Sequence, residues 1–504
     1  MRTALLMLIA GAALDLTSII GWGNSGVGTA FWVLLVLGIA AAAWHRLSWG
    51  VLIIFLELLW GSHGHLLHGT FGQVTFSLRM GTFLAVLSAL PWHLRAPDAR
   101  TTLWASVRAH PARLPAVMFF VSLIVALLLG MLWHPWGDVY RDANAWAFLA
   151  LAPAILLGTA HKQDRILLER VLLWGAGYLI LRTFLILFIF THDLNGAWLP
   201  LYRWIRDTRL GEITWFAGGF PRIFLPSMAL LFPVAFLSGY RALHAAIMRS
   251  AIPYAILSGS SVTVLVVSLS RSYWLALLIL GAMGCGYGIL MWRRTGITPV
   301  PAMRAAVLVG AVVGSMGIAA ILAWMPYPQR LSSSGLSATL AKRLLTSQEP
   351  AIANRWQQLM PLRTAIARHA IFGNGFGATV TYTSKDPRTL AAFPDGQYTT
   401  SAVEWGYLDD GLERGVVGVL TELWVVFAVV GMAFRAGGAP AALGCGLLGI
   451  AVVHVVSPYL NHPLGIGALL LMAAVSSRAK TPAAERTASG LSERAMHGSS
   501  RIRA

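Results

Sequence analysis

The sequence predicts an all-α polytopic integral membrane protein, from its composition and from two patterns along the chain. Of its 504 residues, 57% are hydrophobic and only 12% are charged, a balance outside the range of ordinary soluble domains. Apolar runs long enough to cross a bilayer as helices recur along most of the chain. Lys and Arg collect between these runs, so the net charge of +18 is typical of cytoplasmic loops and predicts no nucleic-acid partner.

Hydropathy predicts about 14 transmembrane helices, the first of which begins near the N-terminus. The opening MRTALLMLIAGAA is similar to a signal peptide, but the apolar run continues through Ile20, which favours a transmembrane helix. The expected spans are 3–20, 29–44, 48–60, 71–91, 115–133, 147–160, 166–191, 223–239, 251–268, 272–292, 304–325, 414–434, 440–457 and 463–477.

These spans divide the chain into four parts. Residues 1–325 carry eleven helices with short loops, 326–413 form one large loop, 414–477 carry three helices, and 478–504 are a basic tail. The tail is rich in Ala, Ser and Arg without periodicity, which predicts disorder. Both cysteines lie inside apolar runs and provide neither a disulfide framework nor a metal-ligand spacing.

The basic segments indicate that both termini are cytoplasmic, because Lys and Arg are enriched on that side of a membrane. The apolar run 251–292 is too long for one span, so it must form two helices that meet at residues 269–272. Both outer ends of this pair are basic, which predicts that Arg271 lies at an extracytoplasmic turn. The same reasoning places residues 134–146, 191–222 and the large loop outside.

Five of the ionisable residues within the predicted spans are singled out here as candidate functional residues, because charges are costly in a membrane. They are Asp15, Glu57, Arg79, Arg182 and Glu422, and all five fall in the outer half of the membrane. If the bundle gathers them, they line a polar cavity under the large loop, with Arg79 and Arg182 as substrate-binding candidates. The alternative is a set of structural ion pairs, for example Asp15 with Arg79.

Arginines also stand on the predicted outer face, where positive charge is normally depleted. Arg222 lies where an external segment enters the membrane, and Arg271 lies at the tight turn. A guanidinium donates two parallel hydrogen bonds to a phosphate, so these two residues predict an anionic ligand. The alternative for each arginine is a lipid headgroup contact or a snorkelling side chain.

The large loop contains a predicted amphipathic helix at 355–370, which carries Arg355 and Arg363 and which Pro361 is expected to break or kink. The glycine-rich segment FGNGFG that follows at 372–377 predicts a turn. It is a weak candidate for a phosphate cradle, because no strand precedes it.

Four carboxylates close the loop. Asp409, Asp410 and Glu413 are accounted for as ordinary complements to the dipole of the next helix. Glu404 stands further out, beside Trp405 and Tyr407, and aromatic neighbours that exclude water can raise the pKa of a carboxyl toward the working range. The sequence therefore predicts Glu404 as a catalytic base.

Three short motifs, in this order around one large external loop, resemble those of the O-antigen ligase and Wzy-type polysaccharide polymerase superfamily. They are SLSRSYWLALLI at 268–279, IFGNGFG at 371–377 and YLDDGLERGVVGVL at 407–420. The resemblance covers roughly residues 221–420, and the N-terminal half matches only as a set of spans. It implies that Arg222 and Arg271 hold a donor diphosphate. Glu404 departs from the pattern, because ligases typically carry a histidine at that position.

The resemblance implies transfer of a glycan from an undecaprenyl-diphosphate-linked donor to an acceptor sugar at the periplasmic face of a bacterial inner membrane. Arg355, Arg363 and Tyr407 join Arg79 and Arg182 as substrate-binding candidates. A carboxylate base opposite an anionic leaving group implies inversion at the sugar carbon. The predicted external loops contain no Asp-x-Asp cluster, so we expect transfer without a metal or other cofactor. The acceptor is another repeat unit, a lipid A core or a protein, and a chain-length regulator is a possible partner. Glu404 and the 14 spans favour a polymerase over a ligase.

Two other classes of membrane protein remain as alternatives. A transporter or flippase for lipid-linked oligosaccharides would also contain an arginine-rich cavity, but it usually has symmetry-related halves, and no internal repeat is evident. A structural scaffold would not need buried charges at a common depth.

Overall fold

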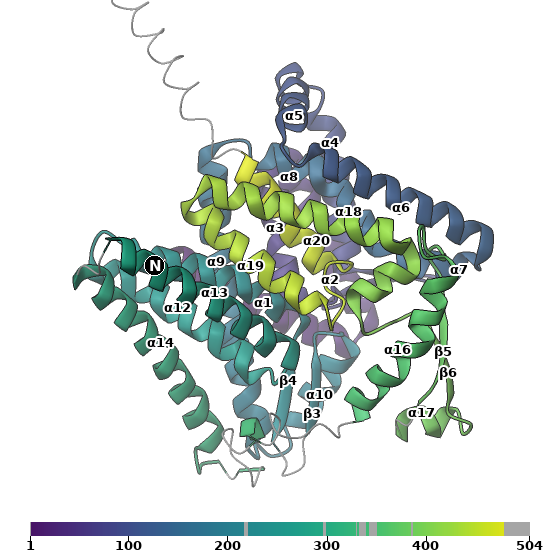
Figure 1. Ribbon diagram of the computed structural model, residues 1–504. Coiled ribbons are helices and arrows are strands. Elements are labelled where there is room, and N and C mark those ends of the chain that lie inside the picture. The colour runs from purple at the N-terminus through teal and green to yellow at the C-terminus, as the bar shows by residue number, and fades with distance from the viewer. Residues whose placement is uncertain are drawn as a thin grey trace, which may run out of the picture.

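The computed structural model describes residues 2–215, 220–295, 299–328, 330–331, 339–341, 350–384 and 387–477, and the expected disordered tail lies outside them. These residues form a mostly helical bundle with three two-stranded antiparallel hairpins (Figure 1).

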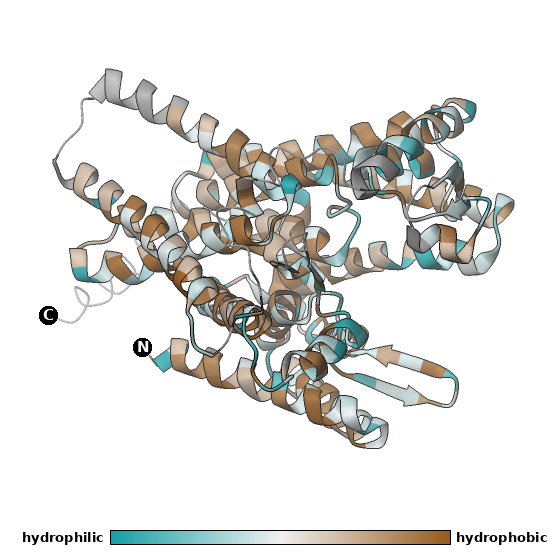
Figure 2. Cartoon of the chain, turned by 90° about the horizontal axis from the view of Figure 1, so that it is seen from below, coloured by the Kyte–Doolittle hydropathy of each residue, from teal (hydrophilic) through white to brown (hydrophobic). Residues whose placement is uncertain are grey.

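Seven of the described helices are long and apolar enough to cross a membrane. They are α1 (Arg2–Gly23), α2 (Ser25–His45), α6 (Arg113–Trp133), α9 (Lys162–Thr191), α12 (Met248–Val267), α14 (Pro299–Trp324) and α18 (Gly406–Ala436). Shorter apolar stretches accompany them in α3 (Leu47–Gly61), α19 (Gly438–His454), α20 (Pro463–Ser477) and the part Arg271–Cys285 of α13 (Arg271–Thr295). Hydrophobic residues also cover outward faces of these helices (Figure 2), where Leu132 is 76% exposed. The chain is therefore a multi-pass membrane protein.

The predicted span 71–91 is wrong in its first seven residues. They belong to a hairpin of β1 (His68–Phe71) and β2 (Val74–Ser77), and α4 (Leu78–His93) begins only afterwards. The β-branched and aromatic residues around Gly72 favour this hairpin over a helix. The Ser77 hydroxyl then accepts a hydrogen bond from the Met80 amide at 3.2 Å, which fixes the start of α4.

Two further predicted spans are also interrupted. The span predicted at 147–160 consists of a 3-10 helix η1 (Asn144–Leu151) followed by the short α8 (Ala152–Gly158). The span predicted at 223–239 includes the end of β4 (Pro221–Phe224) and a 3-10 turn η2 (Pro226–Leu230) before α11 (Leu231–Leu243). Proline lacks an amide proton, so Pro226 favours a helix that starts at this point rather than one that runs through it.

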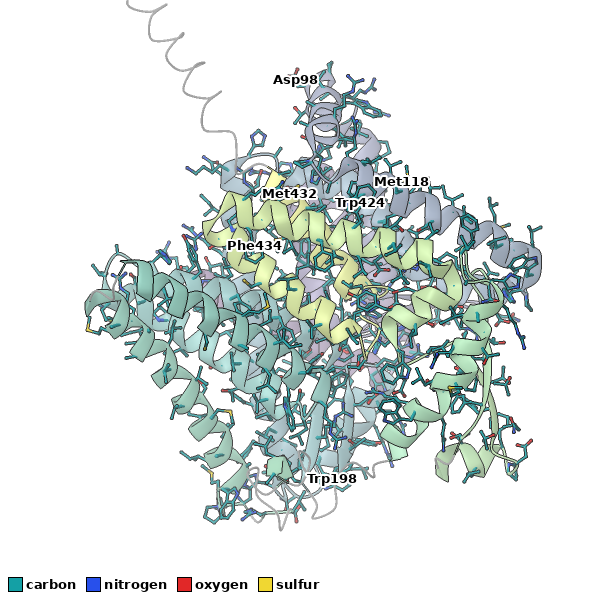
Figure 3. All side chains as sticks on the ribbon, in the orientation of Figure 1. Asp98, Met118, Trp198, Trp424, Met432 and Phe434 are labelled. Carbon is teal, nitrogen blue, oxygen red and sulfur yellow. The ribbon has the colours of Figure 1, made fainter. Side chains whose placement is uncertain are left out.

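Two features mark opposite ends of the bundle. The amphipathic helix α5 (Pro97–Ala109) lies at one end, and β4 lies at the other with its partner β3 (Glu212–Trp215) and with α10 (Trp198–Asp207) (Figure 1). Asp98 of α5 and Trp198 of α10 accordingly lie at the two extremes of the molecule (Figure 3). We refer to these as the α5 end and the β4 end.

The predicted meeting point of two helices near residues 269–272 is confirmed. Helix α12 ends at Val267 and α13 begins at Arg271. Between them, Leu269 adopts a left-handed backbone conformation with φ of 53° and is fully buried. A bulky residue rarely takes this conformation, so burial of its side chain holds the turn in one shape.

The described part of the large loop has a small core of its own. Helix α16 (Pro350–Arg368) confirms the predicted amphipathic helix, and it continues through Pro361. A hairpin of β5 (Val380–Thr383) and β6 (Gln397–Thr400) encloses the short α17 (Pro387–Ala392). Leu362 and Val380 pack with Leu412, which joins this unit to the first turns of α18. Helix α18 begins at Gly406, eight residues before the predicted span at 414.

Candidate functional site

Arg222 and the turn that precedes Arg271 lie side by side at the β4 end. The Nε of Arg222, on β4, donates a hydrogen bond to the Ser268 carbonyl oxygen at 3.4 Å. Its guanidinium also lies over the Phe224 ring, with its central carbon 4.8 Å from the ring centroid. The strand that carries Arg222 therefore meets the turn between α12 and α13.

Arg355 of α16 adds a second guanidinium to this place. Burial lowers the pKa of Arg222 below its ordinary value; the Glu212 carboxylate opposes this shift, and the positive charge of nearby Arg355 contributes to it. Arg355 itself forms an ion pair with Glu404. We call Arg222, Arg355 and Glu404 the arginine cluster; Arg271 begins α13 three residues after Ser268, the residue that Arg222 contacts.

Glu404 is held by its neighbours on two sides. Its carboxylate pairs with the Arg355 guanidinium, and the Nε1 of the adjacent Trp405 donates to the Arg355 carbonyl oxygen at 3.0 Å. The Trp405 ring meets the Trp356 ring edge to face, with centroids 5.8 Å apart. Trp405 thus packs beside the ion pair, whereas Tyr407, the other predicted aromatic neighbour, points away, and the Glu404 side chain is 43% exposed.

Arg363 and Tyr407 occupy different surroundings. Arg363 is exposed on α16, two helical turns beyond Arg355. Tyr407 points into the bundle, where its hydroxyl donates to the Ala451 carbonyl oxygen at 3.2 Å and its ring meets the His454 ring edge-on at 4.6 Å. Tyr407 therefore belongs to a second group of residues described below.

Arg79 and Arg182 have structural partners. Arg79 donates to both carboxylate oxygens of Glu57, at 2.8 and 3.1 Å, and Arg182 pairs with Asp15 at 3.1 Å. The suggested pairing of Asp15 with Arg79 is therefore wrong, since each arginine has a different carboxylate.

Both arginines also serve the end of α3. Arg182 donates to the Trp60 carbonyl oxygen at 2.8 Å, and Arg79 donates to the Ser62 carbonyl oxygen at 2.6 Å. The last carbonyl groups of a helix have no partner within it, so two buried guanidiniums satisfy them here. The common depth predicted for Arg79, Arg182 and their carboxylate partners is therefore explained by their position around the end of α3.

Helix α18 is broken at Gly415, which has φ of 64° and so leaves the helical conformation. The break frees two carbonyl oxygens and two amide groups, and the predicted glycine-rich turn satisfies all four. Asn374 N and Gly375 N donate to the carbonyl oxygens of Leu412 and Glu413, at 2.7 and 2.9 Å. In return, Val416 N and Val417 N donate to the carbonyl oxygens of Ala370 and Ile371, at 2.8 and 3.2 Å.

Glycines allow this turn to lie between two helices. Gly373 and Gly375 have φ of 78° and 79°. An added β-carbon at Gly373 would collide with the backbone of Glu413, and one at Gly375 would collide with the backbone of Gly130 on α6. The predicted turn is thus a structural plug in a broken membrane helix.

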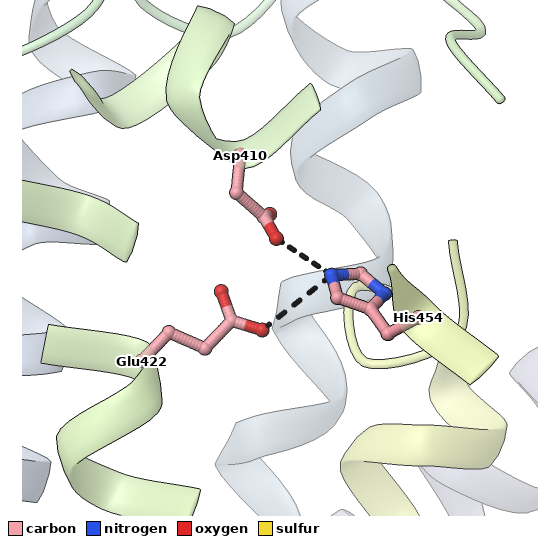
Figure 4. A group of neighbouring side chains, drawn as sticks. All are labelled: Asp410, Glu422 and His454. Carbon is pink, nitrogen blue, oxygen red and sulfur yellow. Dashed lines mark hydrogen bonds and ion pairs between the residues drawn. The ribbon is translucent and has the colours of Figure 1, made fainter. Parts of the chain in front are cut away.

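A buried ionic network surrounds this break. Arg414 forms ion pairs with Asp410 and Glu422, and its side chain is fully buried. Its guanidinium lies 4.8 Å from the Trp146 ring centroid and 5.2 Å from that of Phe119. The network also includes His454 of α19, whose Nε2 lies 2.7 Å from Asp410 Oδ2 (Figure 4).

Asp410, Glu422 and His454 offer ligand atoms within 4.8 Å of one another, which is close enough to hold a metal ion. The hydrogen bonds of His454 do not fit a metal, however. Its Nδ1 accepts hydrogen bonds from the amides of Tyr459 and Leu460, at 2.9 and 3.1 Å, so this nitrogen carries no proton. The proton of the neutral ring is then on Nε2, which donates it to Asp410 and has no lone pair for a metal.

The segment after His454 connects the ionic network to the arginine cluster. Tyr459, whose amide donates to His454, shares a hydrogen bond of 2.6 Å with the hydroxyl of Tyr273 on α13. Burial raises the pKa of Tyr459, and the positive charge of Arg222 opposes that shift. The same segment supplies Asn461, whose side-chain amide donates to Asp409 at 3.0 Å.

This network was not predicted, although the sequence carries two signals of it. Arg414 follows Asp410 at the i, i+4 spacing of a helical ion pair. His454 lies in the apolar sequence AVVHVV, where a buried ionisable residue is itself a signal. The return of α19 against α18 could not be obtained from hydropathy.

Comparisons with known proteins identify no relative: neither a family model nor a curated protein matches the chain.

Proposed function

We propose that this protein is a membrane-embedded glycosyltransferase that moves a glycan from an undecaprenyl-diphosphate carrier to an acceptor sugar. The observation that carries the proposal is the arginine cluster. Arg222, the turn before Arg271, and the two partners of the Arg355–Glu404 ion pair come from four segments of the chain and meet at the β4 end. Positive charge next to a membrane helix turn suits a lipid-linked diphosphate.

The glycosyl transfer mainly requires positive charge at the position where the leaving diphosphate becomes negative. The hydroxyl oxygen of the acceptor attacks the anomeric carbon while the bond from that carbon to the phosphate oxygen breaks. The diphosphate leaves with the electron pair, and Arg222 and Arg271 stabilise the negative charge that develops on it. Partial burial of Arg222 strengthens this interaction, since less water competes for the guanidinium.

Glu404 would accept the proton that the hydroxyl releases. In the ion pair with Arg355 it is a carboxylate, the form that can act as a base. Arg355 pairs with Glu404 and its charge also acts on Arg222, so donor diphosphate binding and the position of the base would be coupled through one guanidinium. Attack opposite the leaving group inverts the anomeric carbon.

The proposal includes an orientation in the membrane. The β4 end faces the periplasm of a bacterial inner membrane, and both termini face the cytoplasm. The opposite end is rich in arginine, as expected for a cytoplasmic face. Helix α5 and the residues on either side of it carry Arg95, Arg100, Arg108 and Arg113. With the short and interrupted helices counted as spans, the chain would cross the membrane about 14 times.

The test replaces Arg271 with Ala and with Lys and measures glycan chain formation in cells with matched protein levels. We expect the Ala variant to lose roughly 10²–10³-fold in rate, as when one electrostatic stabiliser is removed. Lys keeps the charge without the planar fork and should lose less. Arg368→Gln, exposed on α16, is the control and should be unaffected. Full activity in both Arg271 variants would remove the diphosphate role.

Glu404→Gln, assayed over a pH series, tests the base separately. We expect a slower reaction with a flatter pH profile, since the amide cannot accept the proton. An unchanged rate and profile would exclude Glu404 as the base while leaving the arginine role intact.

A transporter or flippase for lipid-linked oligosaccharides is the second candidate, and the broken α18 favours it, because transporters often bind substrates at interrupted helices. Purified protein in vesicles without an ion gradient distinguishes the two. Longer or transferred glycans from a lipid-linked oligosaccharide support the transferase. Movement of the lipid across the bilayer without a new glycan bond supports the flippase.

The acceptor separates polymerase from ligase. In a deletion strain, loss of polymer with single repeats still attached indicates a polymerase, and loss of all attachment indicates a ligase. The same products identify the acceptor as a sugar or a lipid A core. Their length distribution shows whether a chain-length regulator acts.

A further inference from the structure

Two adjoining cavities open at the α5 end, far from the arginine cluster. The larger, of about 490 Å³, lies between the start of α9, the end of α11 and the start of α12. The smaller, of about 250 Å³, lies between α9, α11, α19 and the end of α20. They share Ile166 and Glu169 of α9 as a common wall. The ring of His110, just after α5, lies 3.2 Å from the Ala473 carbonyl oxygen of α20, which ties this region to α5.

The charges around both cavities favour an anionic ligand. Four cations line them, namely Lys162, Arg165, Arg170 and Arg241, against a single carboxylate, Glu169. Arg241 already engages both oxygens of Glu169, at 2.5 and 2.6 Å, and Arg165 donates to two backbone carbonyl oxygens. Lys162 and Arg170 are both exposed at the mouths, where they can meet a phosphate.

The walls are those of a site at a membrane interface. The rings of Trp174 and Tyr254 stack with centroids 6.4 Å apart in the larger cavity. Tryptophan and tyrosine favour the headgroup level of a bilayer. The smaller cavity is lined mainly by apolar residues beyond Lys162 and Arg165.

An apolar extension continues from the smaller cavity into the bundle. It is a narrow space of about 30 Å³ and shares Leu172, Leu237, Leu443 and Leu471 with the smaller cavity. All of its lining residues are apolar, among them Phe55 of α3. A ligand that fits the cavities and the extension together has an anionic head and a hydrocarbon chain.

We propose that this place binds one anionic glycerophospholipid, with its phosphate between Lys162 and Arg170 and one acyl chain along the leucines toward the extension. Basic pockets between transmembrane helices are suited to such headgroups. The site is independent of the proposed glycan transfer, whose diphosphate would lie at the opposite end of the bundle. Binding would hold α9, α11, α19 and α20 together at the α5 end.

The test measures lipid binding by delipidated full-length protein in detergent, using native mass spectrometry and thermal unfolding. Phosphatidylglycerol is expected to bind at a single high-affinity site and to raise the unfolding temperature, whereas phosphatidylcholine and inorganic phosphate are not. Lys162→Gln with Arg170→Gln should weaken phosphatidylglycerol binding about 30-fold, from the loss of two cations near a phosphate. Arg108→Gln with Arg113→Gln removes two exposed cations near α5 and should leave binding unchanged.

A second variant tests the acyl chain. Ala439→Trp fills the smaller cavity without changing any charge and should also abolish the single strong site. Equal binding of phosphatidylglycerol and phosphatidylcholine to the wild-type protein would overturn the proposal, whatever the variants do. Stabilisation by inorganic phosphate alone would replace the lipid with a bare anion. Full phosphatidylglycerol binding by Ala439→Trp would place the lipid outside the two cavities and would also overturn the proposal.

Discussion

Arg414 is a fully buried cation with both of its carboxylate partners on the helix that carries it. Each of the three charges would be costly in a membrane interior without the others. Both carboxylates accept from one nitrogen of the guanidinium, Nη2, and two aromatic rings lie against its face, so the arrangement stabilises one geometry of the broken α18. The same principle holds for Arg79 and Arg182, whose carboxylate partners allow them to cap α3.

Replacing Arg414 with Met should destabilise the protein by about 3–5 kcal/mol, because Asp410 and Glu422 stay buried without their cation. Adding Asp410→Asn and Glu422→Gln to the same variant removes the stranded charges and should recover much of this loss. Denaturant unfolding in detergent measures both changes. Arg368→Met, on the exposed face of α16, is the control and should change stability by no more than about 0.5 kcal/mol. Wild-type stability of Arg414→Met would contradict the ionic network.

His65 gives the stability a pH dependence of known sign. Burial, together with the positive charges of Arg209 and Arg79, lowers the pKa of His65 to about 4, from an ordinary value of 6.5. Between these two values the unfolded chain binds a proton that the folded chain does not, so stability falls as the pH drops through this window. Below about pH 4 both states are protonated and the effect levels off. His65→Asn should show a smaller fall in unfolding temperature over the same window, and an identical fall would refute the assignment.

At the scale of elements, α18 and the glycine-rich turn form one unit although they are separated in the chain. The turn provides the hydrogen bonds that the break at Gly415 removes, and glycines at 373, 375 and 415 permit the close approach. The turn was predicted correctly from the glycines. Its role in satisfying the backbone groups at the break was not predicted, since nothing in the local pattern shows that α18 is broken.

Gly415→Ala should destabilise the protein by more than about 1–2 kcal/mol, the usual cost of a left-handed backbone for a residue with a β-carbon. The added methyl would also collide with the Ile371 carbonyl group. Gly431→Ala is the matched control in the same helix, because open space surrounds its position. The control should be neutral or stabilising by up to about 1 kcal/mol, as for alanine in a helix. Equal stability of the two variants would mean that α18 can pass through Gly415 without a break.

At the scale of the whole molecule, the apolar runs predicted the helical membrane fold because each span must satisfy its own backbone in lipid. Prediction failed where a span is short or interrupted, as at residues 71–77, because a hydropathy window averages over the Gly72 turn. The proximity of Arg222 to the turn before Arg271 was predicted because both stand at helix ends on one expected face. The partners of Asp15 and Glu57 were not predicted, since the packing of α1 on α9 and α3 on α4 is not encoded in local patterns.

The two ends of the bundle should be accessible from opposite sides of the membrane. In a variant without Cys285 and Cys445, a cysteine at Asp98 should resist a membrane-impermeant maleimide in spheroplasts, and one at Ala197 should react with it. Both positions are exposed, and Asp98 lies at the extreme opposite Trp198, the residue next to Ala197 (Figure 3). Permeabilised cells, in which both positions should react, provide the control. Reaction of both cysteines in sealed spheroplasts would overturn the orientation on which the proposed function depends.

The plug at Gly415 has a consequence for synthesis. Residues 370–375 leave the ribosome before α18 does, so they are made before the break that they fill. Until they dock, the interrupted helix exposes four backbone groups to lipid, so its early state should be a ready target for quality-control proteases. The loop thus assists the assembly of the helix that follows it. A foreign domain could replace the loop only if it also supplied the hydrogen bonds that satisfy the break at Gly415.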